Sequence, residues 1–229
     1  MKAVIIGILV TVGIIGSFIL IGNLASKDDA TDPSSESDKV PPVAVNEDPN
    51  AIYTEHVRGN LESDVEFYEY LDFQCPFCGQ YYPLIEQVFQ EYGDRVKFVT
   101  RSYPITTAHP NALVAHRAAE AAGAQGKFFE MHDLLFERQQ LWSNSDNPKE
   151  IMDQFATELE LDMDRYNAVY NDPATLAFIN AQAKGGADAG VTSTPTFALN
   201  RVILKQPPTS LVDFQELLDE ALAEQAPAQ

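Results

Sequence analysis

The feature that most restricts the fold of this sequence is a strand, a helix and a strand in close succession, with two cysteines at the first junction. Over residues 65–72, side chains such as Val65 and Phe67 alternate with more polar ones such as Glu66, which predicts a β-strand. Apolar residues then recur at helical spacing over 76–92, and residues 96–101 predict a second strand. Two strands joined in this way form a βαβ unit, whose crossover is almost always right-handed. The chain is therefore predicted to build an α/β sheet.

The rest of the sequence predicts helices, then two strands and a final helix. Asn147 and Pro148 suit the cap and the first position of one of these helices. Ser210 and Asp213 have the spacing of a capping box at the start of the last helix. An all-helical insertion over about residues 105–190 thus separates the N-terminal βαβ unit from a C-terminal unit of two strands and a helix. The predicted elements are helices over 110–123, around 128–135, from 148, near 163–171 and 174–188, then strands over 196–199 and 202–204, with a hairpin turn at Asn200-Arg201.

The N-terminal residues predict a membrane anchor. Residues 3–22 contain no charged side chain and are mostly aliphatic, and a helix of that length spans about 30 Å, the thickness of the hydrocarbon core of a bilayer. We predict a transmembrane anchor over 1–24, and favour it over a cleaved signal peptide because Asn23 would occupy a poor cleavage position. No cysteine directly follows the apolar run, which excludes lipoprotein processing. Either interpretation places the remainder outside the cytoplasm, where disulfides persist.

The charge of the chain is strongly acidic. It has 15 basic and 34 acidic side chains, a formal net charge of −19, and residues 53–229 hold 12 of the basic and 27 of the acidic ones. This balance argues against nucleic-acid binding, which needs basic side chains to displace counterions, and against a polybasic membrane-surface protein. Residues 25–52 are rich in Asp, Ser and Pro and lack aromatic side chains. They predict a flexible acidic linker that leads to a folded domain over 53–229.

The two cysteines flank Pro76 and Phe77 at the end of a strand and the start of a helix. Free backbone N–H groups and the helix dipole stabilise an anion at such a position. Cys75 is therefore expected to be the thiolate, while Cys78 lies one turn inward and can resolve a mixed disulfide. Because the thiolate belongs to the reduced state, its stabilisation makes the disulfide a stronger oxidant.

Two other interpretations of the cysteine pair remain open on these residues. A structural disulfide would close a very small loop and would therefore stabilise little. A zinc site needs three or four ligands, and none of the four histidines lies at zinc-finger spacing from the cysteines. The sequence thus predicts no metal site. His109, His116 and His132 are predicted to be surface or packing residues, and Trp142 to be a core or groove-lining residue.

The segment EYLDFQCPFC, followed about 115 residues later by TSTPTF, resembles the DsbA-like branch of thioredoxin-fold thiol–disulfide oxidoreductases. The stretch AHPNALVAHRAAEAAGAQGKFFEMHDLLFERQQLW resembles the helices inserted in that branch, and the likeness spans about residues 59–222. It implies a thioredoxin-like α/β fold with an all-helical insertion, Cys75 as nucleophile and Cys78 as resolving thiol. It also implies that the Thr194-Pro195 bond is cis and faces the cysteines, with the Thr194 backbone available to pair with an extended substrate.

Glu69 lies on the same strand phase as Val65 and Phe67, where a carboxylate is unfavourable unless it is paired or protonated. The family has an acidic residue six positions before the first cysteine, and we predict that Glu69 relays protons to Cys78. The alternative is a strand buried on both faces, in which Glu69 is merely hydrogen-bonded or exposed at an edge. Pro76-Phe77 should tune the potential. It replaces the Pro-His of the best-known periplasmic oxidases and so lacks an imidazole to stabilise the thiolate.

These features predict a membrane-tethered, extracytoplasmic dithiol oxidase, periplasmic or at the cell surface, that introduces disulfides into reduced or misoxidised exported proteins. The cysteine pair carries the electrons, so no metal or organic cofactor is expected. The resemblance implies a quinone-linked membrane partner that reoxidises the pair. Two alternatives stay open: a reductase or isomerase of the same fold, and a non-catalytic tethered peptide-binding module with a structural disulfide.

Overall fold

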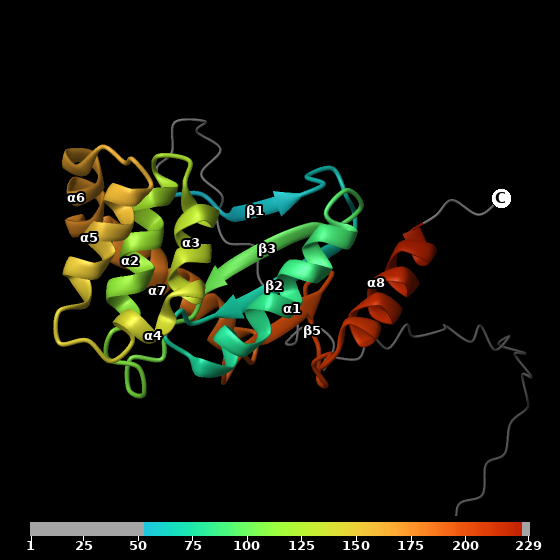
Figure 1. Ribbon diagram of the computed structural model, residues 1–229. Helices are drawn as coiled ribbons and strands as arrows, with labels where there is room; N and C mark the ends of the chain where they lie inside the picture. The colour runs from blue at the N-terminus through green and yellow to red at the C-terminus, as the bar shows by residue number, and fades with distance from the viewer. Residues whose placement is uncertain (1–52, 226–229) are drawn as a thin grey trace, which may run out of the picture. The chain divides into compact units, whose positions relative to one another are not determined.

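The computed structural model describes residues 53–225 (Figure 1). The anchor predicted over 1–24 and the linker predicted over 25–52 lie outside these residues. Within 53–225, none of the helices combines the length and the apolar character that crossing a bilayer requires.

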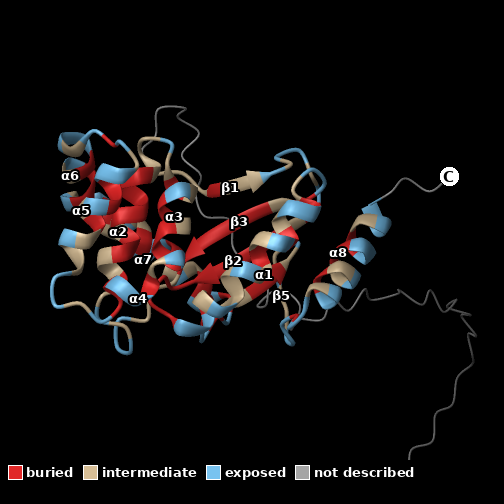
Figure 2. Cartoon of the chain, viewed as in Figure 1, coloured by how far each residue is buried: buried red, intermediate tan, exposed pale blue. Residues whose placement is uncertain are grey.

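A five-stranded sheet with strand order β1-β3-β2-β4-β5 forms the centre of the described part. Strand β2 (Glu66–Leu71) pairs in parallel with β3 (Lys97–Ser102) and antiparallel with β4 (Thr196–Leu199). The edge strands β1 (His56–Gly59) and β5 (Val202–Ile203) pair antiparallel with β3 and β4. The parallel pairing of β2 and β3 confirms the predicted βαβ unit. Figure 2 shows that the two central strands are almost wholly buried.

The helices are divided between the sheet and the insertion. Helix α1 (Pro76–Tyr92) and helix α8 (Leu211–Gln225) pack on one face of the sheet, where their apolar side chains meet Phe67 and Phe197 (Figure 1). Six helices between β3 and β4 confirm the predicted all-helical insertion. They are α2 (Ala112–Gly123), α3 (Phe128–Glu137), α4 (Gln139–Trp142), α5 (Pro148–Glu158), α6 (Met163–Asn171) and α7 (Pro173–Asp188).

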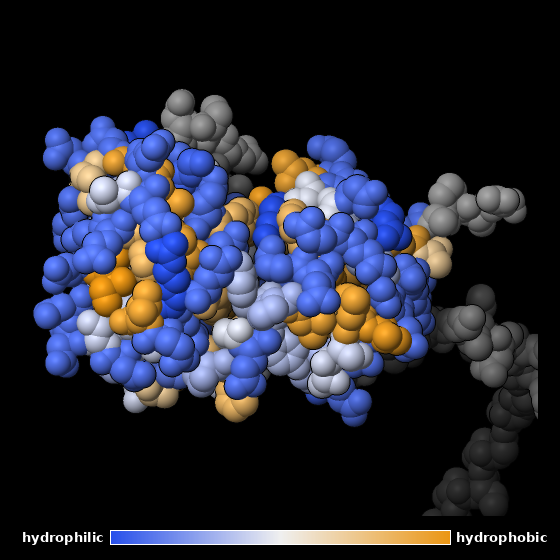
Figure 3. All heavy atoms as spheres, in the orientation of Figure 1, coloured by the Kyte–Doolittle hydropathy of each residue, from blue (hydrophilic) through white to orange (hydrophobic). Residues whose placement is uncertain are grey.

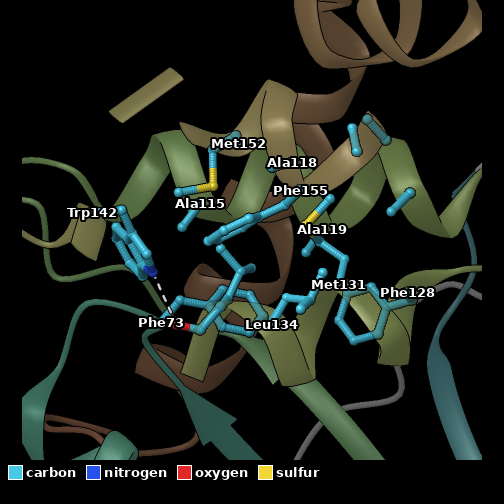
Figure 4. Close-up of a cluster of buried hydrophobic side chains, with 14 of the residues drawn as sticks. Phe73, Ala115, Ala118, Ala119, Phe128, Met131, Leu134, Trp142, Met152 and Phe155 are labelled. Carbon is cyan, nitrogen blue, oxygen red and sulfur yellow. Dashed lines mark hydrogen bonds between the residues drawn. The ribbon is translucent and has the colours of Figure 1, made fainter. Parts of the chain in front are cut away.

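The insertion has its own hydrophobic core, shown in Figure 4. Small side chains of α2, including Ala115 and Ala119, allow neighbouring helices to approach closely. Trp142 is fully buried, and its indole Nε1–H donates to the carbonyl oxygen of Leu135 at 2.9 Å. Trp142 is therefore a core residue. Because Phe73 also belongs to this cluster, the core reaches the loop that carries the cysteines.

The surface seen in Figure 3 is mostly hydrophilic, with apolar side chains gathered in separate patches. This agrees with the strongly acidic composition of the chain. Few large apolar side chains of the described residues are exposed to solvent; they are Leu61, Phe77, Leu141, Val202 and Val212.

One predicted turn and one predicted capping box are confirmed. Asn200 and Arg201 have φ angles of 49° and 69°, the left-handed conformation of a tight hairpin turn between β4 and β5. At the start of α8, the Asp213 N–H donates to Ser210 Oγ at 3.2 Å, and the Ser210 N–H donates to Asp213 Oδ2 at 3.0 Å. This reciprocal pair is the predicted capping box.

Asn147 is the N-cap residue of α5 and Pro148 occupies its first turn, as predicted. The Asn147 side chain, however, makes no capping hydrogen bond. Its backbone has φ −126° and ψ 57°, which differs from the extended conformation typical of a capping residue, and its N–H donates to Ser145 Oγ at 3.0 Å. The polar turn before the helix therefore determines the conformation of this residue.

Strand β1 and the short helix α4 were not predicted. The four residues of β1 show no clear alternation, and the strand forms by pairing with β3. Gly59 ends β1 with a φ of 91°, and a Cβ atom there would lie 2.4 Å from the carbonyl oxygen of Val96. A glycine is therefore required where the chain leaves the edge of the sheet.

Candidate active site

The two cysteines lie where β2 gives way to α1. Cys75 is the N-cap residue of α1 with an extended backbone, and Cys78 lies in the first turn of that helix. The Cys75 N–H donates to the carbonyl oxygen of Asp72 at 3.0 Å, which holds the turn between strand and helix. Both thiols are free, and both residues are buried, Cys78 completely. The structure thus confirms that Cys78 lies inward of Cys75.

The loop before β4 completes the site from a distant part of the sequence. The Thr194-Pro195 bond is cis, as predicted. Because Thr196 pairs with Tyr70 in β2, the loop is held beside the cysteines. Cys75 Sγ lies 3.3 Å from the carbonyl oxygen of Thr194, to which the thiol donates when it is protonated, so the loop faces the first cysteine as expected.

The two thiols have opposite pKa shifts. The pKa of Cys75 is lowered to about 5, first by a hydrogen bond from Cys78, then by Thr194 and backbone N–H groups, which together outweigh burial. Burial raises the pKa of Cys78 well above its usual value, and the neighbouring Cys75 raises it further. Within the described residues, the buried hydroxyl of Thr194 has no hydrogen-bond partner and is free to donate to a Cys75 thiolate. The site therefore separates one ionised thiol from one protonated thiol.

Glu69 is buried in the centre of β2 and lines a small internal cavity together with Arg58. Burial raises its pKa to about 7, Arg58 opposes this shift, and Glu86 adds to it. The charge of Glu69 also contributes to the raised pKa of Cys78. Strand β2 is buried on both faces, as the alternative interpretation of this residue assumed. Even so, Glu69 titrates near neutral pH, where a proton carrier is useful.

The two residues between the cysteines differ in their surroundings. Pro76 occupies the start of α1, where its missing N–H is not needed. Phe77 directs its side chain into solvent, with 61% of its surface exposed. Its backbone N–H contributes to the lowered pKa of Cys75. The influence of Phe77 on the thiolate is thus exerted by its backbone, while its side chain is free for contact with other molecules.

A buried acid beneath the cysteine loop was missed by the sequence reasoning. The Asp72 carboxylate is fully buried and accepts hydrogen bonds from the backbone N–H of Gln74 and of Ile105, each at 2.8 Å. It also accepts one from Nδ1 of His109 at 2.7 Å. Its only sequence signal is an acidic residue at the end of a buried strand. Asp72 fixes the turn that leads to Cys75.

Gln139 of α4 connects the insertion to the same loop. Its amide Nε2 donates to the carbonyl oxygens of Phe73 and Cys75, at 2.8 and 2.9 Å. Its Oε1 lies so close to Gly79 that an added Cβ atom there would be only 2.8 Å away. Glycine at 79 therefore permits the approach of Gln139, and no local sequence pattern indicates this contact.

The four histidines make packing contacts and hydrogen bonds within the protein. His116 and His132 are buried in the insertion, and burial lowers the pKa of His116 to about 4. His56 pairs with Glu120 at 2.9 Å. Within residues 53–225, no group of three or more His, Cys, Asp and Glu side chains is placed to hold a metal ion.

Comparisons with known sequences agree with this architecture. A family model described as thioredoxin matches residues 52–220. The chain is also 39% identical over 146 residues to the Na(+)/H(+) antiporter NhaA 1 of Salinispora arenicola, a match that covers 64% of this chain and 22% of that protein. The chain thus spans about a fifth of the length of the curated relatives it matches.

Solved structures show the same fold. A thioredoxin-like oxidoreductase from Silicibacter pomeroyi has a TM-score of 0.64 and 25% identity, with 78% of this chain and 95% of that chain covered. The thiol-disulfide exchange protein alpha-DsbA2 from Wolbachia pipientis has a TM-score of 0.61 and 23% identity, with 75% and 87% covered. The fold is therefore DsbA-like, with a thioredoxin-like sheet and a helical insertion, as the sequence predicted.

Proposed function

This chain belongs to the thioredoxin family, and on that premise we propose that it is an extracytoplasmic thiol–disulfide oxidoreductase that introduces disulfides into exported proteins. The observation that supports this most is the contrast between the two thiols, with a pKa of about 5 at Cys75 and a raised pKa at Cys78. A stabilised thiolate favours the reduced pair and so favours oxidation of a client. This makes the oxidase a better candidate than a reductase, isomerase or non-catalytic binding module.

The proposed reaction starts from the disulfide between Cys75 and Cys78. A client thiolate attacks Sγ of Cys75, a mixed disulfide forms, and Cys78 leaves and takes up a proton. A second client thiolate then attacks the client sulfur of the mixed disulfide, and Cys75 leaves as a stable thiolate. The client loses two electrons, which the cysteine pair gains. The pair is thus the only electron carrier that the protein needs.

Four further residues have proposed roles in these steps. Glu69, whose pKa is raised to about 7, exchanges the proton of Cys78 as that thiol forms and reacts. The backbone of Thr194, next to the cis bond of Pro195, pairs with an extended client segment. Pro76 and Phe77 adjust the potential through the first turn of α1. Each role fits the position of the residue: Pro76, Phe77 and Thr194 adjoin the cysteines, and the charge of Glu69 acts on Cys78.

The environment of the domain is also part of the proposal. Residues 3–22 are long and apolar enough to anchor the chain, and the acidic segment 25–52 would tether the domain outside the cytoplasm. Reduced or misoxidised exported proteins would be the clients. A quinone-linked membrane protein would reoxidise the pair, since each turnover leaves two electrons on the cysteines. Neither electron transfer requires nucleic acid or a metal.

The test is to replace Cys78 with alanine in the full chain and to express it in an oxidising compartment. The variant should accumulate mixed disulfides with client proteins through Cys75, because the resolving thiol is missing. The matched Cys75→Ala variant should accumulate far fewer, since its remaining thiol is fully buried. Absence of reducible adducts in both variants would contradict the proposal and favour a binding module.

A further inference from the structure

An open polar cleft adjoins the cysteine loop and has no role in the proposed steps. Its volume is about 680 Å³. Gln74 and Pro76, which flank Cys75 in the chain, form one side, and neither Thr194 nor Pro195 lines it. The other sides are the segment 108–111 before α2, together with Gln139, Gln140 and the loop 143–146. The cleft is therefore separate from the loop that is expected to pair with a client backbone.

Three amide side chains of this cleft direct their NH2 groups at carbonyl oxygens of the protein. Gln74 Nε2 donates to the carbonyl oxygen of Ser143 at 2.6 Å, and Asn111 Nδ2 donates to that of Ser145 at 2.9 Å. Gln139 Nε2 donates to the carbonyl oxygen of Cys75 at 2.9 Å. Carbonyl oxygens can only accept, so these contacts fix which end of each amide is the nitrogen.

Several acceptors remain available in the cleft, beside the exposed amide of Gln140, which can both donate and accept. Within the described residues, Asn111 Oδ1 and Gln139 Oε1 accept no hydrogen bond. Asp146 adds a carboxylate, and no lysine or arginine lines the cleft. A side chain that donates hydrogen bonds and carries a positive charge would suit these acceptors and the Asp146 carboxylate.

We propose that this cleft binds the lysine or arginine side chain of a client segment next to the cysteine that reacts with Cys75. The inference rests on the proposed function, for which it names a class of client. A basic side chain in the cleft would also lie near the thiolate that the reaction releases. The excess of acidic side chains in residues 53–229 would attract such segments from solution.

The direct test uses peptides without thiols, so that it does not depend on redox chemistry. Three labelled peptides carry serine in place of cysteine and differ only in the next residue, which is arginine, glutamine or glutamate. Their binding to the full chain is measured by fluorescence anisotropy. The arginine peptide should bind about three- to ten-fold more tightly than the glutamine peptide, with the glutamate peptide weakest. The difference should shrink in high salt.

Variants at the rim of the cleft show whether binding occurs there. Gln140 is exposed and lines the cleft, so Gln140→Lys should reduce the preference for arginine and Gln140→Glu should increase it. The control is Asp94→Asn, which removes a carboxylate that is 82% exposed at the far end of α1 and should leave the preference unchanged. Equal affinities for the three peptides, or a preference that Gln140→Lys does not alter, would overturn the inference.

Oxidation of dithiothreitol by the same protein separates this inference from the proposed function. If dithiothreitol is oxidised but the peptides bind equally, the cleft inference is wrong while the oxidoreductase remains. If the arginine preference and its loss in Gln140→Lys are observed without any thiol exchange, the cleft binds basic segments and the oxidoreductase proposal is wrong.

Discussion

The potential of the Cys75–Cys78 pair should fall by only about 30 mV per pH unit between about pH 6 and 8, half the slope of an ordinary dithiol. The pKa of Cys75 is about 5, so this sulfur is already a thiolate in that range. Cys78 has a raised pKa and takes up a proton. Reduction therefore consumes two electrons and one proton. Two ordinary thiols would consume two protons, with a slope of about 59 mV.

The same shift sets the size of the effect at pH 7. Lowering the pKa of Cys75 from 9.0 to about 5 spans four units, but only the two between pH 7 and 5 count, since an ordinary thiol is protonated at pH 7. Two units correspond to about 2.7 kcal/mol, or about 60 mV toward a more oxidising pair. Because the pKa is depressed, this stabilisation of the reduced form is present above pH 5 and is lost as the pH falls through 5.

Equilibration of the full chain with glutathione buffers at several pH values, followed by alkylation and mass spectrometry, measures this slope. The ultraviolet absorbance of the Cys75 thiolate in Cys78→Ala gives its ionisation directly, although loss of the Cys78 hydrogen bond should shift the midpoint above 5. A slope near 59 mV from pH 6 to 8 would refute the reasoning. It would show that Cys75 is protonated throughout this range.

Three other variants test separate parts of the structure. Glu69→Gln should slow thiol exchange at pH 7 by about 10²-fold and remove an ionisation near pH 7 from the rate profile, as measured by stopped-flow oxidation of a dithiol. Trp142→Ala should lower the free energy of unfolding in urea by about 3–5 kcal/mol; a smaller loss would show that its surroundings collapse around the cavity. Gln139→Ala removes the amide that donates to the carbonyl oxygen of Cys75 and should lower the free energy of unfolding by about 1–2 kcal/mol. Hydrogen exchange should then be faster in the first turn of α1, and unchanged exchange there would exclude a positioning role for Gln139.

Much of the fold could be predicted because its signals are local. The alternation in β2 and the helical spacing of α1 belong to single elements, and the turn at Asn200 and Arg201 needs only residues that accept a positive φ. The cysteine pair and the Thr194-Pro195 loop could be identified from short sequence motifs. These signals do not depend on the rest of the chain, so they are visible in the sequence.

The contacts that the sequence did not predict join distant elements. Gln139 reaches the carbonyl oxygen of Cys75 across 64 positions, and Asn111 binds Gln74 across 37. Strand β1 likewise depends on pairing with β3. Such contacts arise only after the insertion packs against the sheet, since amide side chains show no periodicity that would mark their partners. The acceptor-rich cleft is a product of the same tertiary packing.

The contact between Cys75 and Thr194 joins residues 119 positions apart and depends on the pairing of β2 with β4. A chain that emerges from its N-terminus, from a ribosome or through a translocation channel, presents both cysteines long before β4 exists. Until that late strand arrives, Thr194 cannot cover the Cys75 sulfur. The nascent protein is thus open to wrong pairing or oxidation at its own cysteines while the insertion is being made, and its site is complete only once β4 has joined the sheet.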